Sequence, residues 1–391
     1  MRRWVKLPAV AVAAATVICF SATVSAGGVG TRSTLAAAIS ASTTTPTGSS
    51  VLIAMGHLHD PSNTFWELFL RPTGDPSWVL HTPPGVASNG GLVLATASSG
   101  ALTLGFLVSA DLKFSPVAQS SDGGAKWSPG ELPSALTSTP DALAVGPRGE
   151  AVALVAAVDQ RVLQTSGDLS DWHTLTTTNA LTHAAPSCGV QEVTAVAYNP
   201  SGQPLLGLRC AEQGEVGILA PSGSAGTEPL VWHDIGPSLG SGSGETSVTR
   251  LVSTADGVEG LAQEQSGTRT SVVGFWGNGT TAQWAGSPEL SIPPAWSVRA
   301  TATGGGSGQG LALLLGSGDR RRVEVVTGPG ASWATLPSAP RGASGVSDVG
   351  AEIDTFVVTG SHLVVWAWTE GAASWLRTAS ISVPVPYGSS S

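Results

Sequence analysis

Charged side chains are scarce in this chain, since aspartate, glutamate, lysine and arginine together make up 12% of its 391 residues. Long amphipathic helices need a charged face, so this scarcity argues against a helical protein. The chain instead has 50 glycines and 26 prolines, which supply the turns that many short strands require. We therefore predict an all-β fold.

Basic side chains are also few, with 18 lysines and arginines against 27 acidic residues, and the formal net charge is −9. Proteins that bind nucleic acids or anionic membrane surfaces need clustered positive charge. We therefore expect no nucleic-acid partner. Apart from the N-terminal region, no apolar run is long enough to span a bilayer, so we expect no membrane contact beyond an N-terminal anchor.

Cysteine is rare as well, with three residues in total. Cys19 lies in the N-terminal apolar run, which leaves Cys188 and Cys210 in the body of the chain. Two cysteines in an exported chain are most simply one disulfide. They flank a turn at residues 199–202, which can bring them together. Neither belongs to a metal-binding motif, and we predict no metal and no cofactor.

The N-terminal region has the pattern of a secretory signal. A positively charged start, an apolar stretch and a small-residue cleavage site follow one another in residues 1–26. The alternative is an uncleaved anchor, because the apolar run extends nearly to Val24. Either way we expect a secreted or cell-envelope protein. Residues 27–50 are small and polar and predict a flexible tether, and residues 51–391 form the folded domain.

One turn motif stands out within this domain. Residues 120–127 have the sequence SSDGGAKW, which fits the pattern Ser-x-Asp-x-Gly-x-x-Trp through Ser120, Asp122, Gly124 and Trp127. In such a turn between antiparallel strands, the aspartate carboxylate accepts hydrogen bonds from backbone amides of the turn. The glycine adopts a backbone conformation that other residues avoid, and the tryptophan covers the turn. These four residues are therefore predicted to be structural.

Tryptophan recurs at intervals of about fifty residues, a spacing that fits one four-stranded propeller blade. We call these residues the marker tryptophans: Trp78, Trp127, Trp172, Trp232, Trp284, Trp333 and Trp375. They predict a β-propeller of seven four-stranded blades, with six or eight blades, a solenoid or two sandwiches as alternatives. The first repeat lacks an innermost strand, and residues 381–386 supply a surplus one. We predict that this C-terminal strand closes the ring.

The motif at residues 120–127, set on a tryptophan-marked repeat, resembles the bacterial neuraminidase repeat (Asp-box) proteins. That family includes sialidases and many non-catalytic β-propellers. The resemblance implies a sialidase-like β-propeller in which the motif lies on blade turns away from any active site. Residues 165–172 form a degraded second copy of the motif.

A sialidase active site requires three arginines, a tyrosine–glutamate pair and an aspartate near the propeller axis. The chain has two tyrosines, Tyr387 in the tail and Tyr198, which falls at a strand end and is expected in the core. Arg71-Pro72 is the nearest fragment of the family's Arg-Ile-Pro segment. No P-loop, Gly-x-Gly-x-x-Gly dinucleotide fingerprint or His-Glu-x-x-His motif is present.

Some tryptophans fall outside the marker set, and four of them are candidates for ligand binding: Trp66, Trp276, Trp366 and Trp368. Their indoles either pack between blades or form platforms on which sugar rings stack. The leading hypothesis is an exported, monomeric, non-catalytic propeller that binds a glycan or protein partner at the cell envelope. The alternative is a sialidase-like glycoside hydrolase or lyase with an axial active site. Arg320 to Arg322 follow a Gly-Ser-Gly-Asp turn and are expected at a solvated loop tip.

Overall fold

The structure is a computed structural model. It describes residues 38–45, 48–56, 64–72, 75, 77–81, 92–96, 102–106, 117–122, 126–130, 140–155, 159–165, 172–211, 214–222, 230–238, 244–254, 256–304, 310–348, 352–359 and 362–382. The chain divides into two units, Met1–Thr34 and Leu35–Ser391, and all described residues belong to the second. The predicted signal, residues 1–26, lies outside the described residues.

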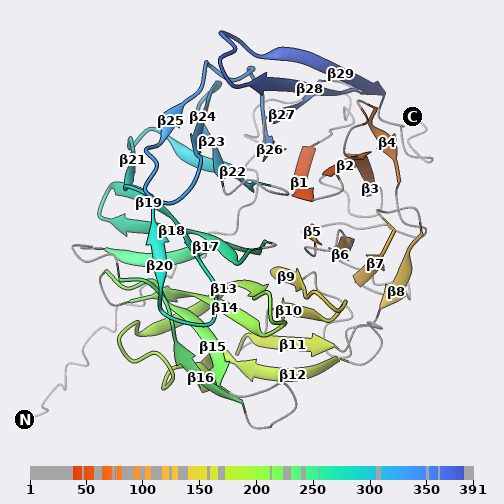
Figure 1. Cartoon of the computed structure of the whole chain (residues 1–391). Coiled ribbons are helices and arrows are strands. Elements are labelled where there is room, and N and C mark those ends of the chain that lie inside the picture. Colours follow the sequence, from red (N-terminus) through yellow and green to blue (C-terminus); the bar gives the residue numbers. More distant parts are fainter. Residues whose placement is uncertain are drawn as a thin grey trace, which may run out of the picture. The chain divides into compact units, whose positions relative to one another are not determined.

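Strands dominate the described residues, and most of them pair antiparallel with the next strand in the chain (Figure 1). The first sheet contains β1 (Ala38–Thr45), β2 (Gly48–Gly56), β3 (Thr64–Pro72) and β4 (Val79–Leu80). The second contains β5 (Leu92–Thr96), β6 (Leu102–Phe106), β7 (Val117–Ser120) and β8 (Ser128–Gly130). The third contains β9 (Ala142–Val145), β10 (Ala151–Val155), β11 (Arg161–Thr165) and β12 (Trp172–Thr177).

The middle of the chain forms a nine-stranded sheet. Its first part contains β13 (Val190–Tyr198), β14 (Pro204–Cys210), β15 (Ile218–Ser222) and β16 (Val231–Asp234). Its second part contains β17 (Glu245–Ser253), β18 (Val258–Ser266), β19 (Arg269–Gly277), β20 (Trp284–Gly286) and β21 (Leu290–Ile292). Two residue pairs between β14 and β17 join the parts. The short helix α1 (Thr178–Leu181) precedes β13, and no helix among the described residues could cross a membrane.

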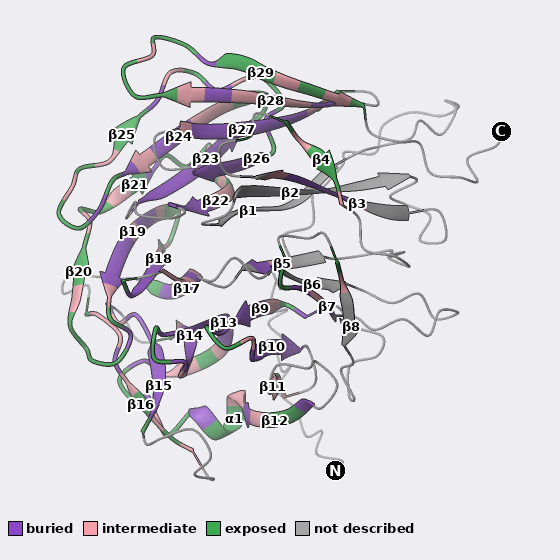
Figure 2. Ribbon diagram, turned by 45° about the vertical axis from the view of Figure 1, so that its right-hand side comes forward, coloured by how far each residue is buried: buried purple, intermediate pink, exposed green. Residues whose placement is uncertain are grey.

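Two further four-stranded sheets complete the described chain. One contains β22 (Ser297–Thr303), β23 (Leu311–Ser317), β24 (Arg320–Val326) and β25 (Ala334–Thr335). The last contains β26 (Gly345–Asp348), β27 (Glu352–Thr359), β28 (His362–Thr369) and β29 (Leu376–Ser382). In both sheets burial falls from the inner strands to the outermost one, as β23 and β25 illustrate (Figure 2).

The first strands of successive meanders lie beside one another. β5 contacts β1 and β9, β13 contacts β9 and β17, and β26 contacts β22 and β1. Apolar side chains fill the spaces between neighbouring sheets, so each sheet buries faces that the next sheet covers. Repeated antiparallel meanders with adjacent first strands are the arrangement of a β-propeller. The prediction of an all-β, propeller-type fold is therefore confirmed.

The marker tryptophans share one structural position. Each lies at, or one residue from, the first residue of an outer strand, namely β4, β8, β12, β16, β20, β25 and β29. Three of their indole nitrogens also donate to a carbonyl just after the previous meander's outer strand: Trp284 to Ile235, Trp333 to Pro288 and Trp375 to Pro337. The period in the sequence thus records a repeated contact between neighbouring sheets.

The predicted pairing of the C-terminal segment with the first sheet is wrong for its described part. Ile381 and Ser382 end β29 and pair with β28, while residues 383–391 lie outside the described residues. The first sheet's innermost strand is β1, from within the predicted tether. A hairpin between adjacent segments costs less loop-closure entropy than pairing between the chain's two ends. The folded body therefore includes Ala38, not only residues 51–391.

The first and last sheets nevertheless pack against each other through their faces. Phe69 of β3 and Phe356 of β27 belong to one buried cluster, and Trp78 meets Phe356 edge to face with ring centroids 5.7 Å apart. Beside this cluster, the guanidinium of Arg71 lies 2.7 Å from Asp354 and 2.9 Å from Glu352 of β27. An apolar cluster, a buried ion pair with Asp354 and a partly exposed one with Glu352 thus join sheets from opposite ends of the chain.

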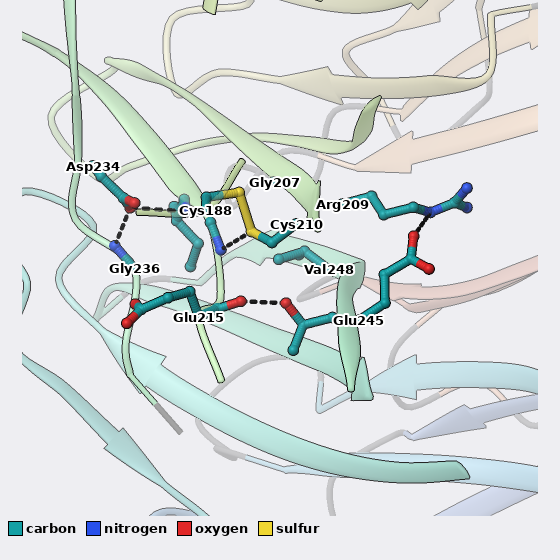
Figure 3. Close-up of a disulfide and its surroundings, with 12 residues drawn as sticks. Cys188, Gly207, Arg209, Cys210, Glu215, Asp234, Gly236, Glu245 and Val248 are labelled. Carbon is teal, nitrogen blue, oxygen red and sulfur yellow. Dashed lines mark hydrogen bonds and ion pairs between the residues drawn. A yellow bond between two sulfur atoms is a disulfide. The ribbon is translucent and has the colours of Figure 1, made fainter. Parts of the chain in front are cut away.

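The predicted disulfide is present between Cys188 and Cys210 (Figure 3). It ties the segment before β13 to the end of β14, on either side of a turn in which Gly202 has a φ of 79°. The amide of Gly217 donates to the Cys210 sulfur, and a Cβ on Gly217 would lie 2.7 Å from the Cys188 sulfur. The close approach of strand and disulfide therefore requires glycine at this position.

Candidate ligand groove and axial cavity

A groove of about 940 Å³ lies on one face of the last sheet. Strands β27, β28 and β29 form its floor, and residues 337–341 and 373–375 form its walls. Its volume lies in the range of small-molecule sites in proteins. The groove is therefore the leading candidate for a ligand site.

The alternation of β28 explains why this face stays partly open. Leu363 and Val365 point to one face, are fully buried and pack against the first sheet. Val364 and Trp366 point to the other face and are only half-buried against the preceding sheet. Successive side chains of a strand alternate between its faces. The indole of Trp366 thus lies where the covering sheet leaves space.

A β-bulge brings an arginine to the same face. Val365 pairs with Ala379, but Trp366 pairs with Arg377, which leaves Thr378 as an extra residue on β29. A regular ladder would place Thr378 opposite Trp366. Bulges re-aim side chains at sheet edges and near binding sites. Here the bulge sets Arg377 directly across from Trp366.

The groove wall is fixed by a hydrogen bond. The indole nitrogen of Trp375 donates to the carbonyl of Pro337 over 2.9 Å, and the Trp375 ring is 8% exposed. This bond joins the turn before β29 to the segment that follows β25. Because both walls are anchored, the groove is formed before any ligand arrives, which lowers the entropic cost of binding.

A second hollow of about 210 Å³, which we call the axial cavity, lies between the first strands of four meanders. Its lining comes from β5, β9, β13 and β17 and includes five polar side chains: Asp141, Thr194, Thr249, Arg250 and Ser253. Desolvation and the nearby Glu192 carboxylate raise the pKa of Asp141. The Thr194 hydroxyl donates to the Val248 carbonyl over 2.7 Å, so this hydroxyl joins neighbouring strands.

Arg250 connects this axial cavity to a buried charged cluster. Its Nη1 donates to the Thr301 carbonyl of β22 over 3.1 Å, while its Nε is buried without a partner. Glu259 of β18 is 1% exposed, and within the described part of the chain neither of its carboxyl oxygens meets a donor in good hydrogen-bond geometry. Burial and, next, the Asp348 carboxylate raise the pKa of Glu259 to about 8, against the opposing effect of Arg250.

The axial cavity does not assemble the groups of a sialidase site. Arg250 is the one arginine among its lining residues in the described chain. Tyr198 is fully buried at the end of β13, as predicted, and its hydroxyl accepts from Gln164. Arg71 lies instead between the first and last sheets. Tyr387 is outside the described residues.

The four candidate tryptophans have different surroundings. Trp366 lines the groove. Trp276 is 4% exposed and packs between neighbouring sheets, which is the first of the two alternatives for its indole. Trp368 packs on the cluster between the last two sheets, and its indole donates to the Ala372 carbonyl. Trp66 lies in β3, and its side chain is outside the described residues.

In the turn after β7, Asp122 makes the hydrogen bonds that the motif at residues 120–127 predicts. Asp122 accepts hydrogen bonds from the Lys126 amide at 2.8 Å and the Ser120 hydroxyl at 2.9 Å, and these bonds lower its pKa. Gly124 is outside the described residues, and the buried Trp127 indole nitrogen has no hydrogen-bond partner among those that are described. This turn lines neither the groove nor the axial cavity.

No protein-family model matches the chain, and no curated protein matches its sequence. Among solved structures, a protein from Lactobacillus plantarum is 13% identical with a TM-score of 0.50, over 87% of this chain and 97% of that one. YCF48 bound to a D1 peptide is 14% identical with a TM-score of 0.41, covering 90% and 97%. A prolyl endopeptidase is 12% identical with a TM-score of 0.49 over 90% of this chain, which spans half of that enzyme's length.

Proposed function

We propose that the chain is an exported, monomeric, non-catalytic β-propeller that binds a glycan or protein partner at the cell envelope. The site is the groove on the last sheet. The observation that carries this proposal is the indole of Trp366, half-buried in the floor of a preformed groove with Arg377 across from it. Exposed indole faces stack on the apolar faces of sugar rings and pack against peptides.

The proposed propeller has seven four-stranded blades. The nine-stranded sheet counts as two blades, because two residue pairs alone join β14 to β17. The ring closes where β26 meets β1 and the faces of the first and last sheets pack. The bonds around Asp122 support the assignment of residues 120–127 to an Asp-box turn of the sialidase-like type.

Export is supported by the N-terminal signal pattern and by the disulfide, since disulfides persist in oxidising compartments. Because the groove lies on the face of a blade, binding there requires no residue of the axial cavity. We assign no cofactor to this function.

The test is glycan-array and peptide-array binding by the chain without residues 1–26. We expect Trp366→Leu to abolish binding and Trp368→Leu to preserve it. Trp368→Leu is the matched control, because it removes an indole that lies on the same strand and face but outside the groove. Equal binding by the wild type and Trp366→Leu would place the site elsewhere.

A sialidase-like glycoside hydrolase or lyase is the second candidate function. Asp141 favours it, because a carboxyl with a raised pKa at the rim of an axial cavity can serve as a general acid. A panel of fluorogenic glycosides tests it. Turnover that Asp141→Asn abolishes would support the enzyme and contradict the non-catalytic proposal.

A further inference from the structure

The groove is lined by basic and hydroxyl side chains. The fourteen lining residues that belong to the described part of the chain include no aspartate or glutamate. They include three side chains that carry or can carry positive charge and four hydroxyls: Arg341, Arg377, His362, Ser338, Thr359, Ser374 and Ser380. The chain as a whole has a net charge of −9. A basic lining on an acidic protein attracts a ligand of opposite charge.

We infer that the groove binds an anionic saccharide, a sugar chain that bears carboxylate or sulfate groups. This inference rests on the proposed binding function and names the ligand class for the same site. Binding needs no covalent step, and the residues act by stacking, ion pairing and hydrogen bonding.

Trp366 and Arg377 form the centre of this site. Residues directly opposite on antiparallel strands have Cβ atoms about 4.5–5.5 Å apart and share a face. A sugar ring stacked on the Trp366 indole therefore places its ring substituents within reach of the Arg377 guanidinium. Arginine binds carboxylate and sulfate-like groups through two parallel hydrogen bonds.

The two arginines of the groove differ in what they already bind. Arg341 pairs with Asp319, whose carboxylate neutralises part of its charge. Arg377 has no acidic partner among the described residues and is exposed to solvent. Its charge is therefore available to a ligand, and Arg377 determines the preference for anionic over neutral sugars.

The hydroxyl groups favour a saccharide over an acidic peptide. Ser380 pairs with Val364 beside Trp366, and Ser338 and Ser374 lie on opposite walls. Hydroxyls both donate and accept, so they match the hydroxyls of a sugar on every side. An extended peptide would instead require backbone partners along a strand edge.

The experiment measures binding of two tetrasaccharides by titration calorimetry at low ionic strength. One probe is a tetramer of galacturonic acid and the other is the neutral galactose tetramer. We expect the acidic tetramer to bind at least about tenfold more tightly, a ratio equivalent to 1.4 kcal/mol. Arg377→Gln should remove this preference but leave neutral binding. Arg320→Gln, an exposed arginine outside the groove, is the matched control and should change neither affinity.

The outcomes separate the two proposals. Loss of the preference at high salt in the wild type, and its absence in Arg377→Gln, support the inference. Equal affinity for both tetramers, with binding still abolished by Trp366→Leu, overturns the inference and keeps the proposed function. Binding of acidic peptides but of neither sugar overturns the saccharide assignment. Binding that Trp366→Leu leaves unchanged overturns both proposals.

Discussion

The buried ion pair between the first and last sheets allows a quantitative test of how the chain's ends are held together. Arg71 lies 2.7 Å from Asp354, whose side chain is completely buried. Arg71 also stacks on the Trp78 ring, 5.4 Å from its centroid. Replacing Arg71 with methionine keeps much of the volume but leaves a buried carboxyl without its cation.

Removing one partner of a buried ion pair costs about 3–5 kcal/mol, whereas replacing both with apolar residues is often neutral. We expect Arg71→Met to lower the free energy of unfolding by about 3–5 kcal/mol. The double variant Arg71→Met/Asp354→Leu should recover most of that loss. The loss in the single variant arises from the desolvated carboxyl that remains, rather than from the missing attraction alone.

Urea unfolding monitored by tryptophan fluorescence measures the free energy of unfolding of each variant. The single variant Asp354→Leu completes the double-mutant cycle. The matched control is Arg269→Met, because Arg269 lies at the same 2.7 Å from Glu289 but is 64% exposed. Exposed pairs contribute about 0–1 kcal/mol. A loss in Arg71→Met no larger than that of the control would refute the packing of the first sheet against the last.

Three further predictions concern stability. Because the pKa of Glu259 is raised from 4.5 to about 8, the folded state holds its proton more tightly, and stability should fall as pH rises from about 5 to 8. The loss is on the order of 4 kcal/mol, and Glu259→Gln should flatten it in urea titrations at each pH; an unchanged slope would contradict the shift. Replacing Cys188 and Cys210 by alanine opens a loop with a sequence separation of 22 and should cost about 3 kcal/mol, with no further effect of reductant on the variant. Trp333→Phe removes the bond to Pro288 and should cost about 1 kcal/mol in thermal unfolding, while a neutral effect would argue against the repeated indole contact.

The fold was predictable from the sequence because each marker tryptophan lies at the start of an outer strand. Trp284, Trp333 and Trp375 start or precede an outer strand and bond to the previous meander. Strand pairing over long sequence separations was not predictable. The strand propensity of residues 381–386 does not reveal whether they pair with the first sheet or, as Ile381 does, with β28.

Side-chain surroundings were harder to predict than strands. Arg320 to Arg322, expected at a loop tip, begin β24. Arg322 stacks on the Trp296 ring at 5.1 Å and pairs with Glu324, because an arginine stem can cover apolar surface while its head keeps a partner. The polar composition of the segment predicts exposure and misses this packing.

Of the residues that line the candidate groove, the sequence points to Trp366. It is a candidate ligand platform because it stands outside the repeat of marker tryptophans, and it lines the groove. Arg377 was missed, because it reaches the groove through a one-residue bulge at Thr378 that no local sequence signal marks. Trp276, chosen on the same grounds as Trp366, is buried by its neighbouring sheet. Composition cannot distinguish these two indoles, whereas the packing of neighbouring sheets does.

The most direct measurement is a crystal structure of the chain without residues 1–26, soaked with the galacturonic acid tetramer. We expect a sugar ring against the Trp366 indole, with a carboxylate beside Arg377. Density for the tetramer beside Arg250 in the axial cavity, with the groove empty, would contradict it.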